Sequence, residues 1–136
     1  MSVGVYYKDA NTAIEWLCKA FGFEVRLKID GEGGVVEHSE LIYEGAVVQV
    51  SDERRQAEKG RKFASPQSLN GGQTMSACFY IDDVDGHCAR AREAGAIITY
   101  EPTVSDYGES YWADKSYQAV DPEGHAWWFI QRMRGE

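Results

Sequence analysis

The segments Val3–Asp9 (VGVYYKD) and Ala77–Asp83 (ACFYIDD) decide how this chain folds, because they are two versions of one pattern. Each is an apolar run that ends in an acidic residue able to cap a helix. An amphipathic stretch follows each run and ends near a glycine, Gly22 in the first copy and Gly95 in the second. The repetition predicts two equivalent units, each beginning with a strand and a helix.

The rest of the first copy predicts three more strands. A helix is expected over residues 10–21, with strands over 23–29, 35–43 and 46–51. Glu44-Gly45 is typical of the two-residue turn that joins antiparallel strands. The first unit is therefore strand, helix, strand, strand, strand.

The second copy repeats this order with a longer insertion before its last hairpin. Its expected elements are a strand over 75–81, a helix capped by Asp83, a strand over 96–100, a long loop over 101–116, and strands over 117–120 and 125–132 joined by the turn Asp121-Pro122-Glu123-Gly124. The prediction is one α+β domain over residues 1–136, made of unit 1–51, connector 52–73 and unit 74–132. The charged start of the connector suggests a short helix.

Composition excludes several classes of function. The 136 residues carry a net charge of −8, which argues against nucleic acid as a partner. No apolar run approaches the roughly 20 residues of a membrane span, and no signal peptide is apparent, so a cytoplasmic protein is expected. Cys18, Cys78 and Cys88 are too widely spaced to indicate a zinc ribbon or a disulfide framework, and we expect them in the core.

Several motifs resemble those of one known group of proteins. They are Phe21-Gly22-Phe23, Ile81–Asp85, the connector segment Ser65–Gly72, and Asp121–His125 followed by Trp127-Trp128-Phe129. In this order, and on a doubled βαβββ pattern, they resemble the vicinal oxygen chelate superfamily, which includes glyoxalase I, extradiol dioxygenases and bleomycin-resistance proteins. The resemblance implies curved mixed sheets around a ligand cavity, and it leaves the activity open.

The resemblance also implies where a divalent metal would bind in the members that catalyse reactions. The four equivalent positions of this chain are Ser2, Gln49, Ser76 and Trp128. Only Gln49 is a credible ligand, so no metal cofactor is expected. The alternative is one divalent metal at a shifted site, with His38, Glu40 and Gln49 as donors.

Strand alternation predicts which side chains face the cavity. The expected lining is Tyr6, His38, Glu40, Gln49, Tyr80, Tyr117 and Trp128, with Tyr111 and Trp112 closing over it from the long loop. These aromatic walls suit a planar or cationic ligand. For any one of these aromatics, packing in the core is an equally good interpretation.

The three histidines have different expected roles. His38 lies two residues from Glu40 on one strand face, which makes this pair the weak candidate for acid–base catalysis. An exposed strand position is the favoured interpretation of His38. His87 is expected to face solvent from the second helix. His125 is expected to bond carbonyl groups near its turn.

Three functions fit the sequence. The preferred one is a metal-free binding protein of the bleomycin-resistance type, which holds an aromatic or cationic small molecule. The alternative is a metal-dependent glyoxalase-like lyase, isomerase or dioxygenase. A third is a subunit whose main role is assembly. A homodimer is expected in each case, with the two units paired either within one chain or between two chains.

Overall fold

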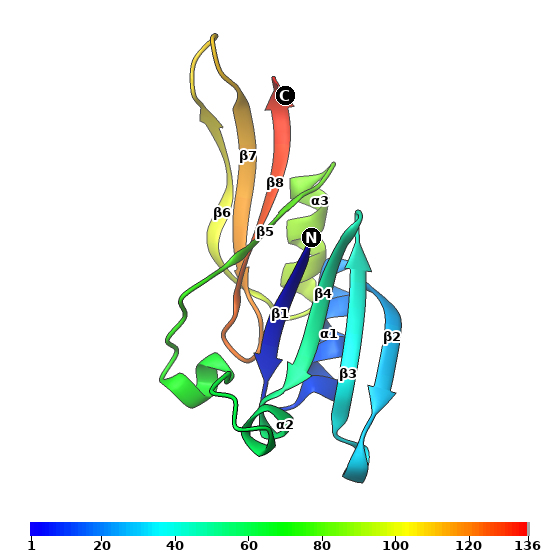
Figure 1. Ribbon diagram of the computed structural model, residues 1–136. Coiled ribbons are helices and arrows are strands. Elements are labelled where there is room, and N and C mark those ends of the chain that lie inside the picture. The colour runs from blue at the N-terminus through cyan, green and yellow to red at the C-terminus, as the bar shows by residue number, and fades with distance from the viewer. Residues whose placement is uncertain (136) are drawn as a thin grey trace.

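Two four-stranded mixed sheets form the framework of the computed structural model, which describes residues 1–135 (Figure 1). Sheet A has the order β1 (Ser2–Tyr7), β4 (Ala46–Asp52), β3 (Val36–Tyr43), β2 (Glu24–Asp30). Sheet B has the order β5 (Ala77–Tyr80), β8 (Ala126–Arg134), β7 (Ala113–Val120), β6 (Ile97–Asp106). The first strand of each unit pairs in parallel with the last, and the other pairs are antiparallel. The predicted α+β fold of tandem βαβββ units is confirmed.

The helices begin where the acidic caps predict. Asp9 accepts a hydrogen bond from the backbone of Thr12 at the start of α1 (Ala10–Phe21), and Asp83 accepts one from Gly86 at the start of α3 (Val84–Glu93). Gly22 ends α1 in the left-handed conformation at φ 78°. Three shorter elements complete the chain: α2 (Glu53–Glu58), η1 (Glu32–Gly34) and η2 (Pro66–Leu69).

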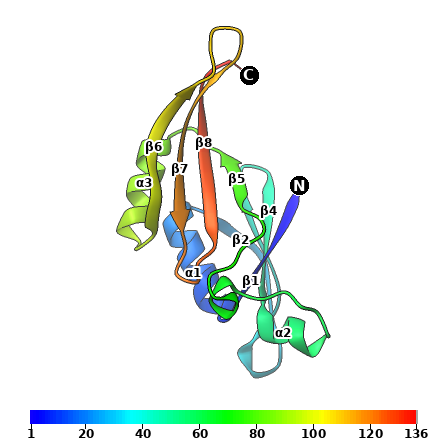
Figure 2. The ribbon, with the colours of Figure 1, turned by 90° about the vertical axis from the view of Figure 1, so that its left-hand side faces the viewer.

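One hydrophobic core lies between the sheets and the two long helices. Alternate strand residues contribute to it, as Val5 and Tyr7 do from β1 and Trp127 and Phe129 do from β8. Phe21 of α1 packs against the rings of both β8 residues. Helix α1 therefore contacts the sheet of the other unit as well as its own, and the units share a single core. Figure 1 shows α1 behind sheet A, and Figure 2 shows sheet B from its side.

Each long helix is completed by side chains of the other. Trp16 Nε1 donates to the carbonyl of Ala94 at the end of α3 (2.8 Å). In the opposite direction, Arg90 Nε donates to the carbonyl of Lys19 (2.8 Å), and His87 Nε2 donates to that of Phe21 (3.0 Å). These are the carbonyls that a helix end leaves without partners.

The expected exposure of His87 was wrong. Its ring is partly buried between the helices and sheet B, and its Nδ1 accepts a hydrogen bond from the Tyr117 hydroxyl (2.5 Å). Because a carbonyl can only accept, the hydrogen on the ring must be on Nε2, which faces Phe21. Burial lowers the pKa of His87 to about 4.

The turn Asp121–His125 joins the second unit to the first. The Asp121 carboxylate is 3% exposed and accepts from the Tyr7 hydroxyl (2.6 Å) and Trp127 Nε1 (3.0 Å). Its other oxygen accepts from the backbone N–H groups of Glu123 and His125. His125 Nε2 donates to the carbonyl of Tyr6 (2.7 Å), in accord with its expected structural role.

The hairpin formed by β6 and β7 is longer than expected. The predicted loop 101–116 is mostly strand, since β6 continues to Asp106 and β7 begins at Ala113. Only residues 107–112 connect them. Residues 103–106 pair with residues 113–116, and this ladder carries sheet B well beyond sheet A (Figure 1).

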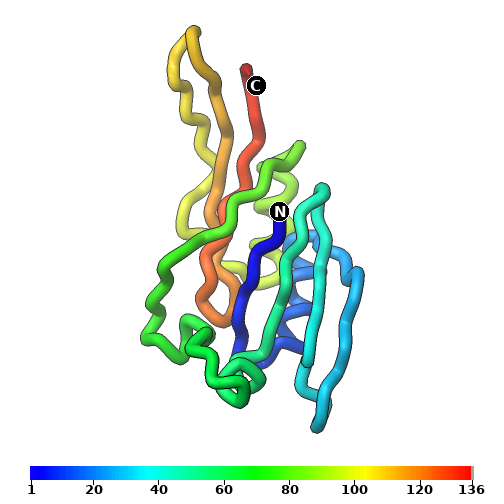
Figure 3. The backbone as a smooth tube through the Cα atoms, in the orientation of Figure 1, coloured from blue at the N-terminus to red at the C-terminus, as the bar shows by residue number. Residues whose placement is uncertain are grey.

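The connector follows the edge of the molecule from the end of β4 to the start of β5, as the green part of Figure 3 shows. Asp52 caps α2, the short helix expected there, and its carboxylate pairs with Arg54 (2.7 Å). Phe63 stacks on Tyr6 of β1, with ring centroids 4.5 Å apart. In residues 1–135, no helix combines the length and apolar character that crossing a membrane requires.

Candidate functional site

Each sheet has one face that the shared core does not cover. Face A is the uncovered face of sheet A, and it carries Ser2, Tyr6, His38, Glu40 and Gln49. Face B is that of sheet B, and it carries Tyr80, Tyr100, Trp112, Gln118, Trp128 and Arg132. The two sheets are separate and do not close into a barrel. Apart from Tyr117, which lies in the core, the predicted strand residues of the lining are therefore divided between two open faces.

Face A carries both polar and apolar side chains, and its Glu40 carboxylate is already paired. Glu40 Oε2 lies 2.9 Å from His38 Nε2, and its other oxygen accepts from Arg26 Nε (3.0 Å). Hydrogen bonds from His38 and Arg26 lower the pKa of Glu40. A carboxylate held in this way is a poor general base, because its proton affinity is reduced. The structure thus brings the His38–Glu40 pair together and gives it a third partner.

Face B is aromatic. Trp128 on β8 packs against Tyr100 of β6 with ring centroids 5.5 Å apart, and it stands opposite Gln118 of β7. Cys78 of β5 pairs with Trp128 on the other side, and it is exposed rather than in the core as expected. Face B therefore offers flat apolar surface beside a polar amide.

Arg132 contacts three side chains at the end of face B away from Trp128: Tyr80, Trp112 and Asp114. Its guanidinium carbon lies 5.4 Å from the Tyr80 ring centroid and 5.3 Å from that of Trp112. Its Nε donates to Asp114 (2.5 Å), and one terminal nitrogen donates to the Tyr80 hydroxyl (3.3 Å). Trp112, expected to close over the site, lies on Arg132 and is 41% exposed.

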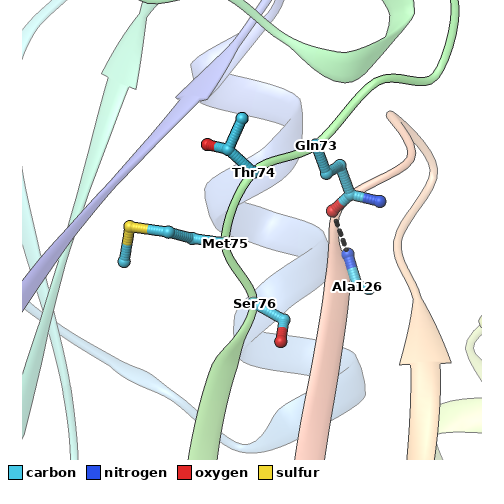
Figure 4. Close-up of a pocket in the computed structure, with 5 residues that line it drawn as sticks. All are labelled: Gln73, Thr74, Met75, Ser76 and Ala126. Carbon is cyan, nitrogen blue, oxygen red and sulfur yellow. Dashed lines mark hydrogen bonds between the residues drawn. The ribbon is translucent and has the colours of Figure 1, made fainter.

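A shallow hollow of about 250 Å³ lies where the chain enters β5 (Figure 4). It is lined by Gln73, Thr74, Met75, Ser76 and Ala126. Gln73 Oε1 accepts from the backbone N–H of Ala126 (2.9 Å) and so holds this segment against β8. The hollow has no charged or aromatic side chain, so we do not assign it a function.

Comparison with known proteins identifies the family. A model of the Glyoxalase/Bleomycin resistance protein/Dioxygenase superfamily matches residues 2–129. The chain belongs to this superfamily. Two relatives are proteins named as uncharacterized. The uncharacterized protein Mb0911c of Mycobacterium bovis is 32% identical over 93% of this chain and 78% of its own length. The uncharacterized protein Rv0887c of Mycobacterium tuberculosis is 32% identical over 93% of this chain and 70% of its own length.

Solved structures share the fold. TioX from a Micromonospora species superposes with a TM-score of 0.73 at 29% identity, over 98% of each chain. TnmS3, an antibiotic binding protein from a Streptomyces species, superposes with a TM-score of 0.68 at 18% identity, over 96% of this chain and 93% of its own. The likeness to TnmS3 shows the fold alone.

The donor set at the superfamily's metal positions does not fit a divalent metal. Ser2 Oγ accepts a hydrogen bond from Gln49 Nε2 (2.8 Å), so these two groups satisfy each other. Ser76 precedes β5, and Trp128 has no oxygen or accepting nitrogen to offer. No group of three or more His, Cys, Asp or Glu residues that could hold a metal ion occurs within residues 1–135.

The prediction that Tyr117 lines the cavity beside Trp128 is wrong, because Tyr117 faces the core. The turn between β7 and β8 has five residues, Asp121–His125, because Val120 pairs with Ala126. A turn one residue shorter would set Tyr117 opposite Trp128, whereas the actual register pairs Tyr117 with Phe129 in the core. Gln118 takes the expected place beside Trp128. Counting by twos from Trp128 along β8 also finds Arg132, which the sequence analysis missed.

Proposed function

We propose that this protein binds a small planar molecule on face B. The observation that supports the proposal is the group of solvent-accessible aromatic side chains around Arg132 and Trp128 on an uncovered sheet face. Rings held in place by strand pairing offer flat apolar area at little entropic cost, and stacking on them requires no catalytic group. TnmS3, which has the same fold, is named as an antibiotic binding protein.

Binding in this proposal does not depend on a metal. Face A holds its carboxylate in ion pairs, and face B offers no donor set for a metal. Elemental analysis of untagged protein purified without chelators is expected to find far less than one equivalent of metal, with no change in melting temperature on adding Ni²⁺, Zn²⁺ or Mn²⁺. One equivalent of bound metal would instead favour a metal-dependent lyase or dioxygenase that uses His38, Glu40 and Gln49.

The proposed site is completed by a second copy of the chain. Face A of one subunit would lie over face B of the other, since the two faces of one chain belong to separate sheets that do not close. Leu27 and Ile29 on the edge strand of face A are 40% and 46% exposed, and this apolar area is what a partner would cover.

We also place the protein in the cytoplasm, where its three free cysteines would stay reduced.

Replacing Ile29 by aspartate is expected to convert the dimer to a monomer, because a charge would be buried in the interface. Light scattering coupled to size-exclusion chromatography measures the mass. Lys28→Asp is the control, since Lys28 pairs with the buried Ser39 rather than with a face A residue. A wild-type monomer, or an Ile29→Asp dimer, would contradict the proposed closure.

Replacing Trp128 by alanine is expected to weaken binding of a planar probe by about fivefold or more, because base-sized rings gain about 1–3 kcal/mol from stacking on an aromatic side chain. The probe is 9-anthracenemethanol, followed by its own fluorescence. Val104→Ala is the matched control, since Val104 is exposed but pairs with Lys115 on the opposite face of sheet B. Equal affinity in the Trp128→Ala variant and wild type would remove Trp128 from the site.

A further inference from the structure

Several hydrogen-bond donors on face B have no partner. Arg132 donates from Nε to Asp114 and from one terminal nitrogen to Tyr80. Its other terminal nitrogen, Nη1, has no partner within residues 1–135 but is buried, so the donor left for a ligand is the second hydrogen of the nitrogen bonded to Tyr80. An arginine side chain has no acceptor to offer. The single carboxylate next to it, Asp114, is 13% exposed at its side chain and already held by Arg132.

Tyr80 and Gln118 also have donor hydrogens without a partner. The Tyr80 oxygen accepts from Arg132, so its hydroxyl hydrogen is free, and the Tyr80 residue is 58% exposed. Gln118 Oε1 accepts from the Thr99 hydroxyl (2.6 Å), which leaves the two hydrogens of its Nε2. The guanidinium bonded to the Tyr80 oxygen also polarises that hydroxyl and makes it a stronger donor.

The donors are spaced along the strip of aromatic rings. Gln118 stands beside Trp128 at one end, and Tyr80 and Arg132 stand at the other. Arg132 lies four positions after Trp128 along β8, which is about 13 Å at the rise of a strand. A ligand that stacks on Trp128 therefore meets a donor beside its ring, and an extended one meets a second set at its far end.

We propose that face B selects planar aromatic molecules that carry an acceptor oxygen, such as a carboxylate or phenolate, over cationic ones. The proposal rests on the binding function assigned to face B above and names its ligand class. The sequence predicts a planar or cationic ligand; the proposal retains a planar ligand and replaces a cationic one with one that carries an acceptor oxygen. Because the whole chain carries a charge of −8, its overall field opposes an anion. A preference for the anion would have to come from the local donors.

Three probes with one ring system test this selection. They are 2-anthracenecarboxylate, 2-anthracenemethanol and 2-anthracenemethylammonium, which carry the substituent at the end of the long ring axis, so that a ring over Trp128 can direct it toward Tyr80 and Arg132. They are titrated at 0.15 M salt, where fields beyond about 8 Å are screened. We expect the carboxylate to bind at least tenfold more tightly than the ammonium, with the alcohol between them. Tyr80→Phe and Arg132→Gln should each weaken carboxylate binding about tenfold without weakening ammonium binding, while Val104→Ala changes neither.

The possible failures are distinguishable. Ammonium binding equal to or tighter than carboxylate binding would overturn the ligand class and leave face B as a binding site. A carboxylate preference that persists in both Tyr80→Phe and Arg132→Gln would overturn the assignment to these donors. If none of the three probes binds at millimolar concentration, the binding function of face B fails, and the ligand class fails with it.

Discussion

Replacement of Asp121 by alanine is expected to lower the free energy of unfolding by about 4 kcal/mol, since it leaves two buried side-chain donors without partners at about 1–3 kcal/mol each. The Tyr7 hydroxyl and Trp127 Nε1 both donate to this carboxylate, and each of these residues is 1% exposed. The backbone of the turn Asp121–His125 loses two further bonds. For a domain with 5–15 kcal/mol of total stability, such a loss is large.

Denaturation in urea, followed by tryptophan fluorescence, measures this loss. Asp82→Ala is the control, because Asp82 is exposed and lies just before the second helix cap, and it should change the unfolding free energy by less than about 0.5 kcal/mol. Tyr7→Phe removes a single donor and should be milder than the Asp121 variant. A loss below about 1 kcal/mol for Asp121→Ala would show that the turn does not hold the two units together.

Acidification from pH 7 to pH 4 is expected to remove up to about 3 kcal/mol of stability through His87 alone, at about 1.4 kcal/mol per pKa unit. Burial lowers the pKa of His87 from 6.5 to about 4 in the folded chain. Between these two values the unfolded chain binds a proton that the folded chain does not, so stability falls as the pH drops through this window. Above pH 6.5 both states are neutral, and the contribution is constant.

The comparison with a His87→Gln variant isolates this effect. Carboxylates also titrate near pH 4, so the quantity to measure is the difference between wild type and variant in unfolding free energy, at pH 7 and again at pH 4.5. Glutamine removes the titrating group, and the advantage of wild type should shrink as the pH falls. An advantage that is constant across this range would mean that the ring is protonated equally in both states.

The order of elements could be predicted because its signals are local. Asp9 and Asp83 cap their helices within three residues, and the turn Glu44-Gly45 needs positive φ at both positions, which the structure shows at 48° and 79°. The pairing of Tyr43 with Ala46 then fixes the register of β3 on β4. Gln49 reaches Ser2 as the strand faces require.

The errors came from contacts that are remote in sequence. The length of the turn Asp121–His125 is set by the bonds that Asp121 makes with Tyr7, 114 residues away, so a residue count at the turn alone gave the wrong face for Tyr117. His87 is polar and sits on an amphipathic helix, and only the approach of α1 provides the carbonyl that holds it inside. Arg132 was overlooked because a charged residue on an aromatic face is explained only by Asp114 and the rings around it.

The exchange of hydrogen bonds between the long helices has a consequence for each half of the repeat. Trp16 of the first unit completes the end of α3, while His87 and Arg90 of the second complete the end of α1, and these residues are not the same in the two copies. Each half has come to depend on a side chain that only the other half encodes. A unit produced alone would leave these helix-end carbonyls to water and expose the core face it shares with its neighbour, so we expect either half to be less stable alone than in the pair.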